Sequence, residues 1–279
     1  MENKTLYGVD DGMVMNDVGP WSPEKYGLTR LYCQFFTKGM KGKKWSALVY
    51  LDLYAGAGLS RICGTNEILL GSPLIALSVD VQFDQYVFCE QDAEKMNALQ
   101  SRVNSMFPDA KVRFVTGDCN SPSFDIGTAI PKGALTLCFV DPYDLGIQFS
   151  TLRSLAKNRK MDFLCFIGTG DASRNPHNYP REDSFKVDDF LGTAEWREEW
   201  DQLGRGSSVK PNLGTFVRMK FAAQMETLGY LPTESHQMYA IKNGTGTTIY
   251  HLALFAKNNI AKHYWAQASR YSPPQKSLF

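Results

Sequence analysis

The sequence of 279 residues predicts an open, doubly wound α/β fold, that is, a Rossmann-like parallel sheet with helices on both faces. Short apolar runs alternate with helical patterns from about residue 46 to residue 170. These runs are continuously apolar, which is typical of parallel strands buried on both faces. Near the C-terminus, the pair Asn243-Gly244 stands between two β-rich runs, which indicates that the sheet ends in an antiparallel hairpin.

A helix is expected in the N-terminal part, after about twenty Gly- and Asp-rich residues that we expect to be extended. The segment 21–39 carries its start and stop signals: Ser22 as N-cap, Pro23 at the first helical position, and Gly39 after the last apolar turn. We therefore expect residues 1–45 to form an N-terminal extension whose helix packs on the core.

Strands and helices alternate in the remaining domain, residues 46–279. Strands that run into turns are predicted within 47–58, 85–92, 111–120, 134–144 and 162–170, and the hairpin within 235–257. Helices are predicted at 72–81, 92–107, around 152–156, at 212–229 and at 260–271. Residues 171–211, which include the acidic-aromatic run AEWREEW, interrupt this order and are expected to form an insertion above the sheet edge.

Composition and charge exclude several classes of protein. With 30 basic and 29 acidic residues, the net charge of +1 argues against a protein whose main role is to coat nucleic acid. The six cysteines show no metal-ligand spacing, so no metal site is expected. There is no apolar signal segment and no membrane-length apolar run. We therefore expect a cytoplasmic protein without a membrane anchor.

A glycine-rich turn follows the first predicted strand, in the segment LDLYAGAG. Gly56 and Gly58 allow a tight turn and the close approach of a ligand, and Asp52 places a carboxylate inside the strand. Glu90 ends the next strand, where a carboxylate in this fold accepts hydrogen bonds from ribose hydroxyls. Glu90 lies 32 residues beyond Gly58 instead of the usual ~20, which we attribute to an inserted loop at 59–70.

Further candidates for the same pocket surround these strand ends. Asp118 ends the third strand and is expected to contact an adenine amino group, with Cys119 or Asn120 beside the ring, although an Asp in a turn needs no ligand to explain it. Tyr54 and Gln91 neighbour the glycine turn and Glu90 and complete the candidate cofactor-binding set.

Asp141, Pro142 and Tyr143 end the fourth strand, next to the point where a doubly wound sheet reverses its strand order. We expect Asp141 to accept a hydrogen bond from a substrate amine and Tyr143 to stack on a planar substrate, which makes both of them candidate catalytic residues. Trp21 and Lys25, at the start of the N-terminal helix, are candidates to cover the cofactor, but for Trp21 a core position is the simpler interpretation.

Together, VYLDLYAGAG, FCEQD, GDCN and FVDPY resemble the motifs of class I S-adenosylmethionine-dependent methyltransferases. More narrowly, VGPWSPEKYGLTRLY, GSPLIAL, FVDPY and the terminal HLALFAKN and HYW resemble the three-Cys-motif partner family (TcmP) of bacterial proteins, over about residues 18 to 266. This resemblance implies seven strands ending in a reversed hairpin. It also implies a partner protein that bears a three-cysteine cluster, which this chain lacks.

The resemblance further implies a pocket for S-adenosylmethionine with Asp141 near the transferred methyl group; its residues are Asp52, Gly56, Gly58, Glu90 and Asp118. The acceptor stays open. Methyltransferases that act on base nitrogens often carry D-P-P-Y, and here only D-P-Y stands. Basic and aromatic residues of the insertion suit a nucleotide, a nucleic acid or a protein partner; they are Arg174, Tyr179, Arg181 and Trp196.

Two alternatives compete with methyl transfer. A nicotinamide-dependent dehydrogenase is disfavoured because Arg61 stands where G-x-G-x-x-G has its third glycine. A catalytically silent protein that uses the same fold to hold a three-Cys-motif partner is disfavoured by the retained pocket residues.

Overall fold

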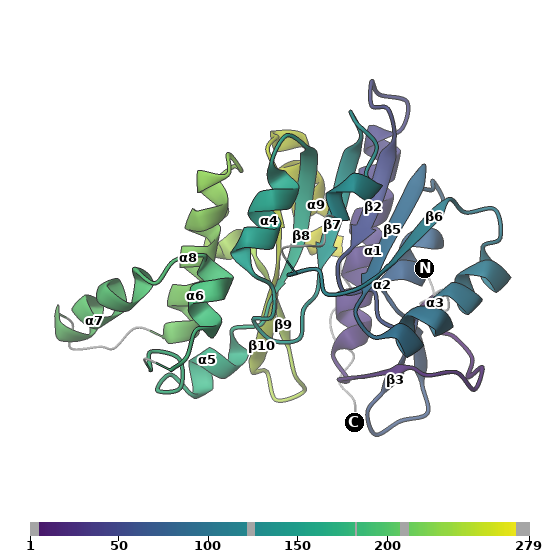
Figure 1. The fold of residues 1–279 in the computed structure, drawn as a ribbon. Helices are drawn as coiled ribbons and strands as arrows, with labels where there is room; N and C mark the ends of the chain where they lie inside the picture. The colour runs from purple at the N-terminus through teal and green to yellow at the C-terminus, as the bar shows by residue number, and fades with distance from the viewer. Residues whose placement is uncertain (1–5, 122–125, 182, 207–211, 272–279) are drawn as a thin grey trace.

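A seven-stranded sheet forms the centre of the computed structural model, which describes residues 6–121, 126–181, 183–206 and 212–271 (Figure 1). The strand order is β6-β5-β2-β7-β8-β10-β9. The first five strands in this order are parallel, whereas β10 runs antiparallel to both β8 and β9. The strand bounds are β2 (Leu48–Asp52), β5 (Gln85–Glu90), β6 (Val112–Thr116), β7 (Leu135–Val140), β8 (Lys160–Ile167), β9 (Tyr239–Lys242) and β10 (Thr248–Phe255). The predicted doubly wound fold with a terminal hairpin is confirmed.

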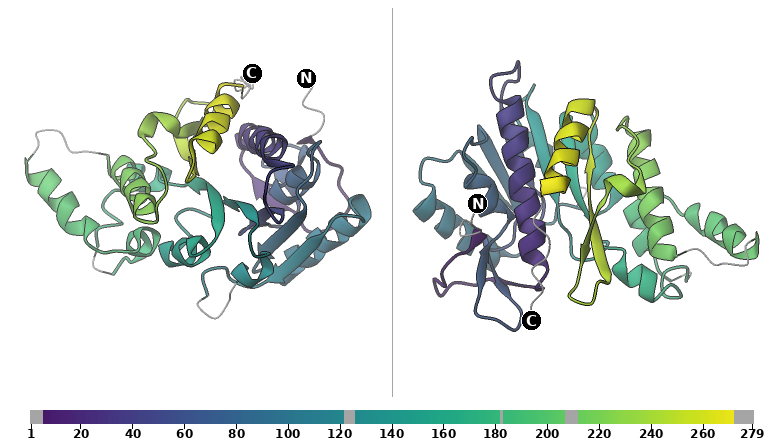
Figure 2. Two further views of the ribbon diagram at one scale, coloured as in Figure 1. Left: turned by 90° about the horizontal axis from the view of Figure 1, so that it is seen from above. Right: turned by 180° about the vertical axis from the view of Figure 1, so that it is seen from behind.

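Helices cover both faces of this sheet (Figure 2). On one face, the core joins the strands to α1 (Ser22–Met40), α2 (Ser72–Leu77), α3 (Ala93–Met106) and α9 (Asn259–Tyr271). On the other face, it joins them to α4 (Phe149–Ala156), α6 (Lys186–Leu191) and α8 (Leu213–Thr227). Successive residues of β2 alternate between the two cores, Tyr50 on the α1 side and Leu51 on the α4 side. Both faces are buried, which explains the continuously apolar strands.

Residues 59–70 correct one expectation. They are not a loop but two antiparallel strands, β3 (Leu59–Ile62) and β4 (Ile68–Leu70), and β1 (Asn16–Val18) pairs parallel with β3. The hairpin accounts for the long spacing between Gly58 and Glu90. It also holds the N-terminal segment, predicted as merely extended, beside the glycine-rich turn.

The boundaries of α1 also differ from those predicted. Trp21, not Ser22, is the N-cap, and it makes no side-chain capping bond. Gly39 lies inside the helix rather than ending it. A Cβ atom at Gly39 would overlap the ring of Tyr264 on α9, so this glycine allows the two helices to pack closely. Gly39, which the sequence indicated as the end of the helix, is instead explained by the contact between α1 and α9.

The insertion leaves the sheet after β8 and extends furthest from it in Figure 1. Its helices are α5 (Gly170–Arg174), α6 and α7 (Trp196–Gly206), and the short helices η2 (Ile126–Ala129) and η3 (Ser235–Gln237) lie elsewhere in the chain. Residues 182 and 207–211 of the predicted insertion, and residues 1–5 of the predicted extension, lie outside the described residues. The division of the chain into extension, domain and insertion stays a prediction.

Within the described ranges, none of the helices combines the length and the apolar character needed to cross a membrane.

The Gly39–Tyr264 contact predicts opposite effects of one substitution in two backgrounds. Gly39→Ala in the wild-type chain should lower the free energy of unfolding by about 1 kcal/mol, because the new methyl group displaces Tyr264. In a Tyr264→Ala background the same change should raise it by about 0.5–1 kcal/mol through helix propensity. Urea unfolding of the four proteins measures both effects, and equal effects in both backgrounds would contradict the close-packing explanation.

Candidate functional site

The carboxyl ends of four neighbouring parallel strands bring the predicted site residues to one edge of the sheet. The order β6-β5-β2-β7 places Asp118, Glu90, the Asp52–Gly58 turn and Asp141 side by side along that edge. Ligands of open α/β sheets bind outside the carboxyl ends of the strands, where the strand order reverses. The edge built by β2 and β7 is such a place.

The turn after β2 and the carboxylate of Glu90 hold each other. Gly56 and Gly58 have φ angles of 60° and 86°, a region in which glycine is strongly favoured. The Gly56 N–H donates to Oε2 of Glu90 at 2.8 Å, and the Asp92 N–H donates to Oε1 at 2.9 Å. Each carboxylate oxygen keeps a second acceptor position. Glu90 is therefore fixed in place with lone pairs left over, as a residue that binds vicinal hydroxyls must be.

The N-terminal segment reinforces this turn, which the sequence did not indicate. Asn16 on β1 accepts a hydrogen bond from the Ala57 N–H at 3.3 Å. Arg102 of α3, almost fully buried, donates to the Ala57 carbonyl at 2.5 Å and to both carboxylate oxygens of Asp11 at 2.7 Å. Charge-assisted bidentate bonds of this kind are strong and geometrically specific. They tie residues that precede the first sheet strand to the backbone of the glycine turn.

Asp52 is fully buried and faces the α1 side of the sheet. It accepts from the Tyr54 N–H at 3.2 Å and from the Tyr50 hydroxyl at 3.3 Å, and the Ser72 hydroxyl also bonds to it. Burial nevertheless raises the pKa of Asp52 to about 7, and the nearby charge of Asp141 adds to this rise. This carboxyl group therefore titrates near neutral pH.

The Asp118 end of the edge is held by a separate network. The exposed Asp118 accepts from the Asn120 N–H at 2.9 Å, which is the turn role weighed against a ligand role. Tyr54 and Asn120 both donate to the Gly146 carbonyl, at 3.2 and 2.8 Å. Burial raises the pKa of Cys119, which bonds with the Tyr54 hydroxyl, to about 11, so its thiol is neutral. Asn120 and Tyr54 therefore join the loops around Asp118.

Asp141 has an occupied carboxylate oxygen, which the sequence alone did not indicate. The Lys25 ammonium donates to Oδ2 at 2.7 Å, and both side chains are largely buried, with 9% and 16% of their surfaces exposed. Burial is the largest single influence and lowers the pKa of Lys25, but the Asp141 carboxylate, together with Tyr26 and Tyr250, raises that pKa overall. Lys25 is consequently a permanent cation in a buried position, and Trp21, for which a core position is the simpler interpretation, is partly buried against the core on the α1 side.

Aromatic rings complete the surroundings of Lys25. Its Nζ lies 4.6 Å from the ring centre of Tyr26 and 4.8 Å from that of Phe166, within the range of cation–π attraction. The ring of Tyr250 is packed on Phe166, and its hydroxyl has no partner among the described residues. The ammonium is thus held by one carboxylate and two aromatic faces.

Two candidate site residues project into solvent. Gln91 is exposed, and Tyr143 is 96% exposed, so its ring lies against nothing in this structure. Phe185 is also exposed, at 64%, and the residues that follow Tyr143 and Phe185 in the sequence, Asp144 and Lys186, form an ion pair of 2.5 Å. The catalytic role of Tyr143 stays a prediction, and so does the cofactor-binding role of Gln91.

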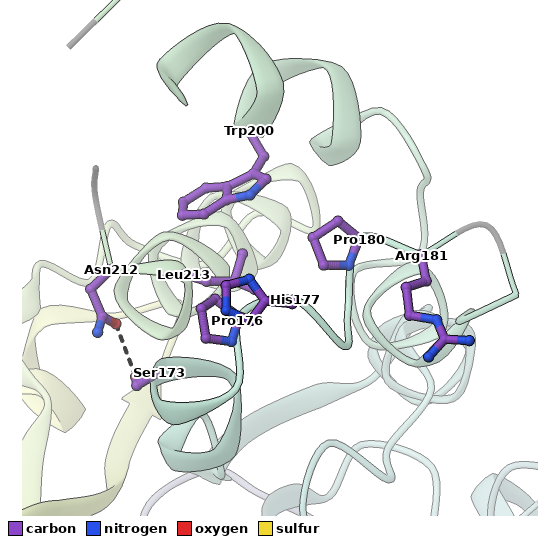
Figure 3. A pocket seen from close by; sticks show the side chains of 8 residues that line it. All are labelled: Ser173, Pro176, His177, Pro180, Arg181, Trp200, Asn212 and Leu213. Carbon is purple, nitrogen blue, oxygen red and sulfur yellow. Dashed lines mark hydrogen bonds between the residues drawn. The ribbon is translucent and has the colours of Figure 1, made fainter. Parts of the chain in front are cut away.

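A cavity of about 580 Å³ lies in the insertion, away from the glycine turn (Figure 3). Trp200 of α7 lies across it from Pro176 and His177, which follow α5. The other lining residues are Ser173, Pro180, Arg181, Asn212 and Leu213. Of the four insertion residues singled out in the sequence, only Arg181 lines this cavity.

Tyr179 and Trp196 instead stabilise the insertion from inside. Both are buried; the Tyr179 hydroxyl donates to Asp171 at 2.6 Å, and the Trp196 indole N–H donates to Asp188 at 2.7 Å. Pattern alone did not separate them from Trp200, because all three are aromatic residues in one polar segment.

Metal and disulfide chemistry find no support in the described part of the chain. No cluster of metal-ligating side chains is found there, and the six cysteines are free, five of them buried.

No family model matches the sequence, and no curated protein matches it at a significant level. Among solved structures, Trm1 from Pyrococcus horikoshii with S-adenosyl-L-methionine aligns over 95% of this chain and 63% of its own, with 10% identity and a TM-score of 0.48. TYW2 of M. jannaschii in complex with AdoMet aligns over 92% of this chain and 83% of its own, with 11% identity and a TM-score of 0.43.

An S-adenosylmethionine-dependent methyltransferase from Clostridium acetobutylicum aligns over 53% of this chain and 54% of its own, with 14% identity and a TM-score of 0.34. This chain thus spans about half the length of the Clostridium protein and less than two thirds of the length of Trm1. The fold assignment rests on the strand order and register described above.

The raised pKa of Asp52 predicts a pH-dependent effect on stability. The pKa of Asp52 is about 7 in the folded protein and near 3.8 in the unfolded chain. The protonated carboxyl group therefore contributes fully to the free energy of unfolding below pH ~4, and this contribution is lost as the pH rises through 7. Asp52→Asn cannot ionise. The difference in free energy of unfolding between this variant and wild type should therefore shift by about 2 kcal/mol in favour of the variant as the pH rises from 5 to 8. Denaturant titrations at both pH values test this, and a constant difference would contradict it.

The Lys25–Asp141 pair predicts strong non-additivity. Lys25→Met leaves a buried carboxylate without a partner and should lower the free energy of unfolding by about 3 kcal/mol. Lys25→Met combined with Asp141→Leu removes both charges and should recover most of that loss. A double-mutant cycle by urea unfolding measures the coupling, and additive losses would show that the two groups do not interact.

Proposed function

We propose that this protein is a methyltransferase that uses S-adenosylmethionine. The observation that carries the proposal is Glu90 at the end of β5, held by the Gly56 N–H and the Asp92 N–H with acceptor positions to spare. A fixed carboxylate beside a glycine turn at the reversal of strand order suits the ribose of an adenosine cofactor. The turn glycines lack the Cβ atoms that would keep a ligand from the backbone.

In this proposal each strand end has one task. Glu90 binds the ribose hydroxyls, Asp118 faces the adenine, and the turn from Asp52 to Gly58 receives the amino-acid part of the cofactor. The turn is kept in shape by Asn16 and Arg102, so the cofactor meets a preorganised backbone.

Asp141 has the task of orienting the acceptor. Its Oδ2 is held by Lys25, and Oδ1 remains to accept an N–H or O–H of the acceptor. The cofactor supplies an electrophilic methyl group: the acceptor lone pair forms the new bond to carbon as the bond from carbon to sulfur breaks. Lys25 holds Asp141 in place, so the protein contributes mainly position and a desolvated surrounding.

The likeness to the three-Cys-motif partner family supports a finer proposal, in which the chain works beside a three-Cys-motif protein. Tyr143 and Phe185 are exposed aromatic residues, and each is the sequence neighbour of one member of the Asp144–Lys186 ion pair. Exposed aromatic residues suit a protein interface. We assign the docking of such a partner to this surface.

A second candidate function is that of a catalytically silent scaffold, which would use the same exposed aromatic surface to bind its partner. Its supporting observation is that Lys25 already occupies one oxygen of Asp141 while Tyr143 points into solvent. A scaffold would retain partner binding after Asp141→Ala and would have no transfer activity to lose. A measurable loss of methyl transfer in that variant, with partner binding intact, decides for the enzyme.

Titration calorimetry with S-adenosylmethionine and S-adenosylhomocysteine tests the primary proposal. Wild type should bind both, and Glu90→Gln should bind at least about 10-fold more weakly, because an amide cannot accept at both of its ends. Glu94→Gln, at an exposed position in the first turn of α3, is the matched control and should bind as wild type does. If folded wild type binds neither compound, the proposal fails.

A further inference from the structure

The cavity of the insertion has the size and the lining of a ligand site. Its volume of about 580 Å³ falls within the range of pockets for small molecules. Indole, imidazole, guanidinium, amide and hydroxyl groups line it, together with two prolines and a leucine, and no acidic residue is among its lining residues. The described walls of the cavity thus combine flat apolar surfaces with positive charge.

Polar bonds hold the walls in place. Asn212 caps α8 by accepting from the Thr215 N–H at 2.9 Å, and the same oxygen accepts from the Ser173 hydroxyl at 2.9 Å. Ser173 and the Thr169 carbonyl fill the space that a Cβ atom at Gly214 would need, so α5 and α8 are in close contact. The floor between α5 and α8 is therefore a packed part of the fold.

Trp200 presents its ring to the cavity from the opposite side. One neighbour of the indole is Phe216 of α8, with ring centres 5.3 Å apart, and across the cavity lie His177 and Pro176 (Figure 3). A planar group that enters between these side chains meets a ring face on one side. Stacking on an aromatic side chain of this kind binds nucleobases with little preference for sequence.

Positive charge lies at another wall of the cavity, where Arg181 stands beyond Pro180 from the indole (Figure 3). Arg181 is bound to Asp183 at 2.9 Å, but with 63% and 70% of their side chains exposed this pair contributes little and yields readily to a phosphate. His177 is exposed and bears the second basic group of the lining. An aromatic face and a guanidinium that line the same cavity match a base with its phosphate.

The cavity belongs to the same sheet edge as Asp141. The helix α5 starts three residues after β8, and a Cβ atom at Gly168 would come within 3.0 Å of the Asp144 carbonyl, in the loop that follows Asp141. Lys186 binds Asp144 from the insertion, and Tyr179 binds Asp171. These contacts join the loop that follows β7 and Asp141 to the segment that forms the cavity wall.

We infer that this cavity binds one nucleotide of the methyl acceptor, with the base on Trp200 and the phosphate at Arg181. The inference rests on the proposed function, because it makes the cavity the substrate side of the same edge. A free nucleotide and a nucleotide within a single strand offer the same base and phosphate. Which of the two is the ligand is decided by comparing how strongly nucleoside monophosphates and homopolymers bind.

Fluorescence anisotropy of the full-length protein with labelled ten-nucleotide homopolymers of RNA and DNA tests the inference, with unlabelled nucleoside monophosphates as competitors. Trp200→Ala should weaken binding about 10-fold through loss of stacking and leave the salt dependence unchanged. Arg181→Gln should weaken binding and lower the slope of log K against log salt by about 1. Arg174→Gln removes an exposed cation of α5 that does not line the cavity, and it should bind as wild type does.

The outcomes separate this inference from the proposed function. Homopolymer binding that falls in both cavity variants supports it; monophosphates that compete at equal strength identify a free nucleotide as the ligand. If Trp200→Ala does not fold, Arg181→Gln and its salt slope decide. Wild type that binds S-adenosylmethionine but no nucleotide or homopolymer overturns the inference alone, as does equal weakening in Arg174→Gln. Failure to bind S-adenosylmethionine overturns the proposed function instead.

Discussion

The buried ion pair between Lys25 and Asp141 is the interaction on which the arrangement of the site depends. It joins the first turn of α1 to the end of β7 across 116 residues of sequence. Two charges taken out of water cost free energy that only close pairing and further favourable contacts offset. Here the aromatic faces of Tyr26 and Phe166 add to the carboxylate. The pair therefore ties the position of α1 to the geometry of the strand end.

The α1 face of the sheet gathers the groups around this pair. Strand residues alternate between faces, so Asp52 follows Tyr50, Phe166 follows Leu164 and Tyr250 precedes Leu252 on the side that α1 covers. Asp141 lies beyond Phe139 on the same side, and the register of β7 with β8 sets Val140 opposite Cys165. Charged and aromatic side chains thus share one small region because of strand parity and register.

The opposite end of the edge has a different physical basis. Around the glycine turn, backbone groups do most of the binding: the Gly56 N–H holds Glu90, and the Ala57 carbonyl receives Arg102. The insertion adds a third kind of surface, a cavity with aromatic and basic walls beyond β8. A backbone cradle, a buried charge pair and a polar-aromatic cavity thus lie in that order along the carboxyl ends of the strands.

The sequence by itself determined the features that depend on neighbouring residues. Continuous apolar runs predicted the doubly buried strands, the Asn-Gly pair predicted the hairpin, and Gly56 and Gly58 predicted the turn beside Glu90, because local pattern and backbone conformation dominate each of these. Tertiary structure alone decided the partner of Asp141, the packing role of Gly39 against Tyr264, and the choice of Trp200 over Trp196 as the cavity residue. Each of these arises from side chains that meet only when distant segments pack, and no local pattern records which surface they will meet.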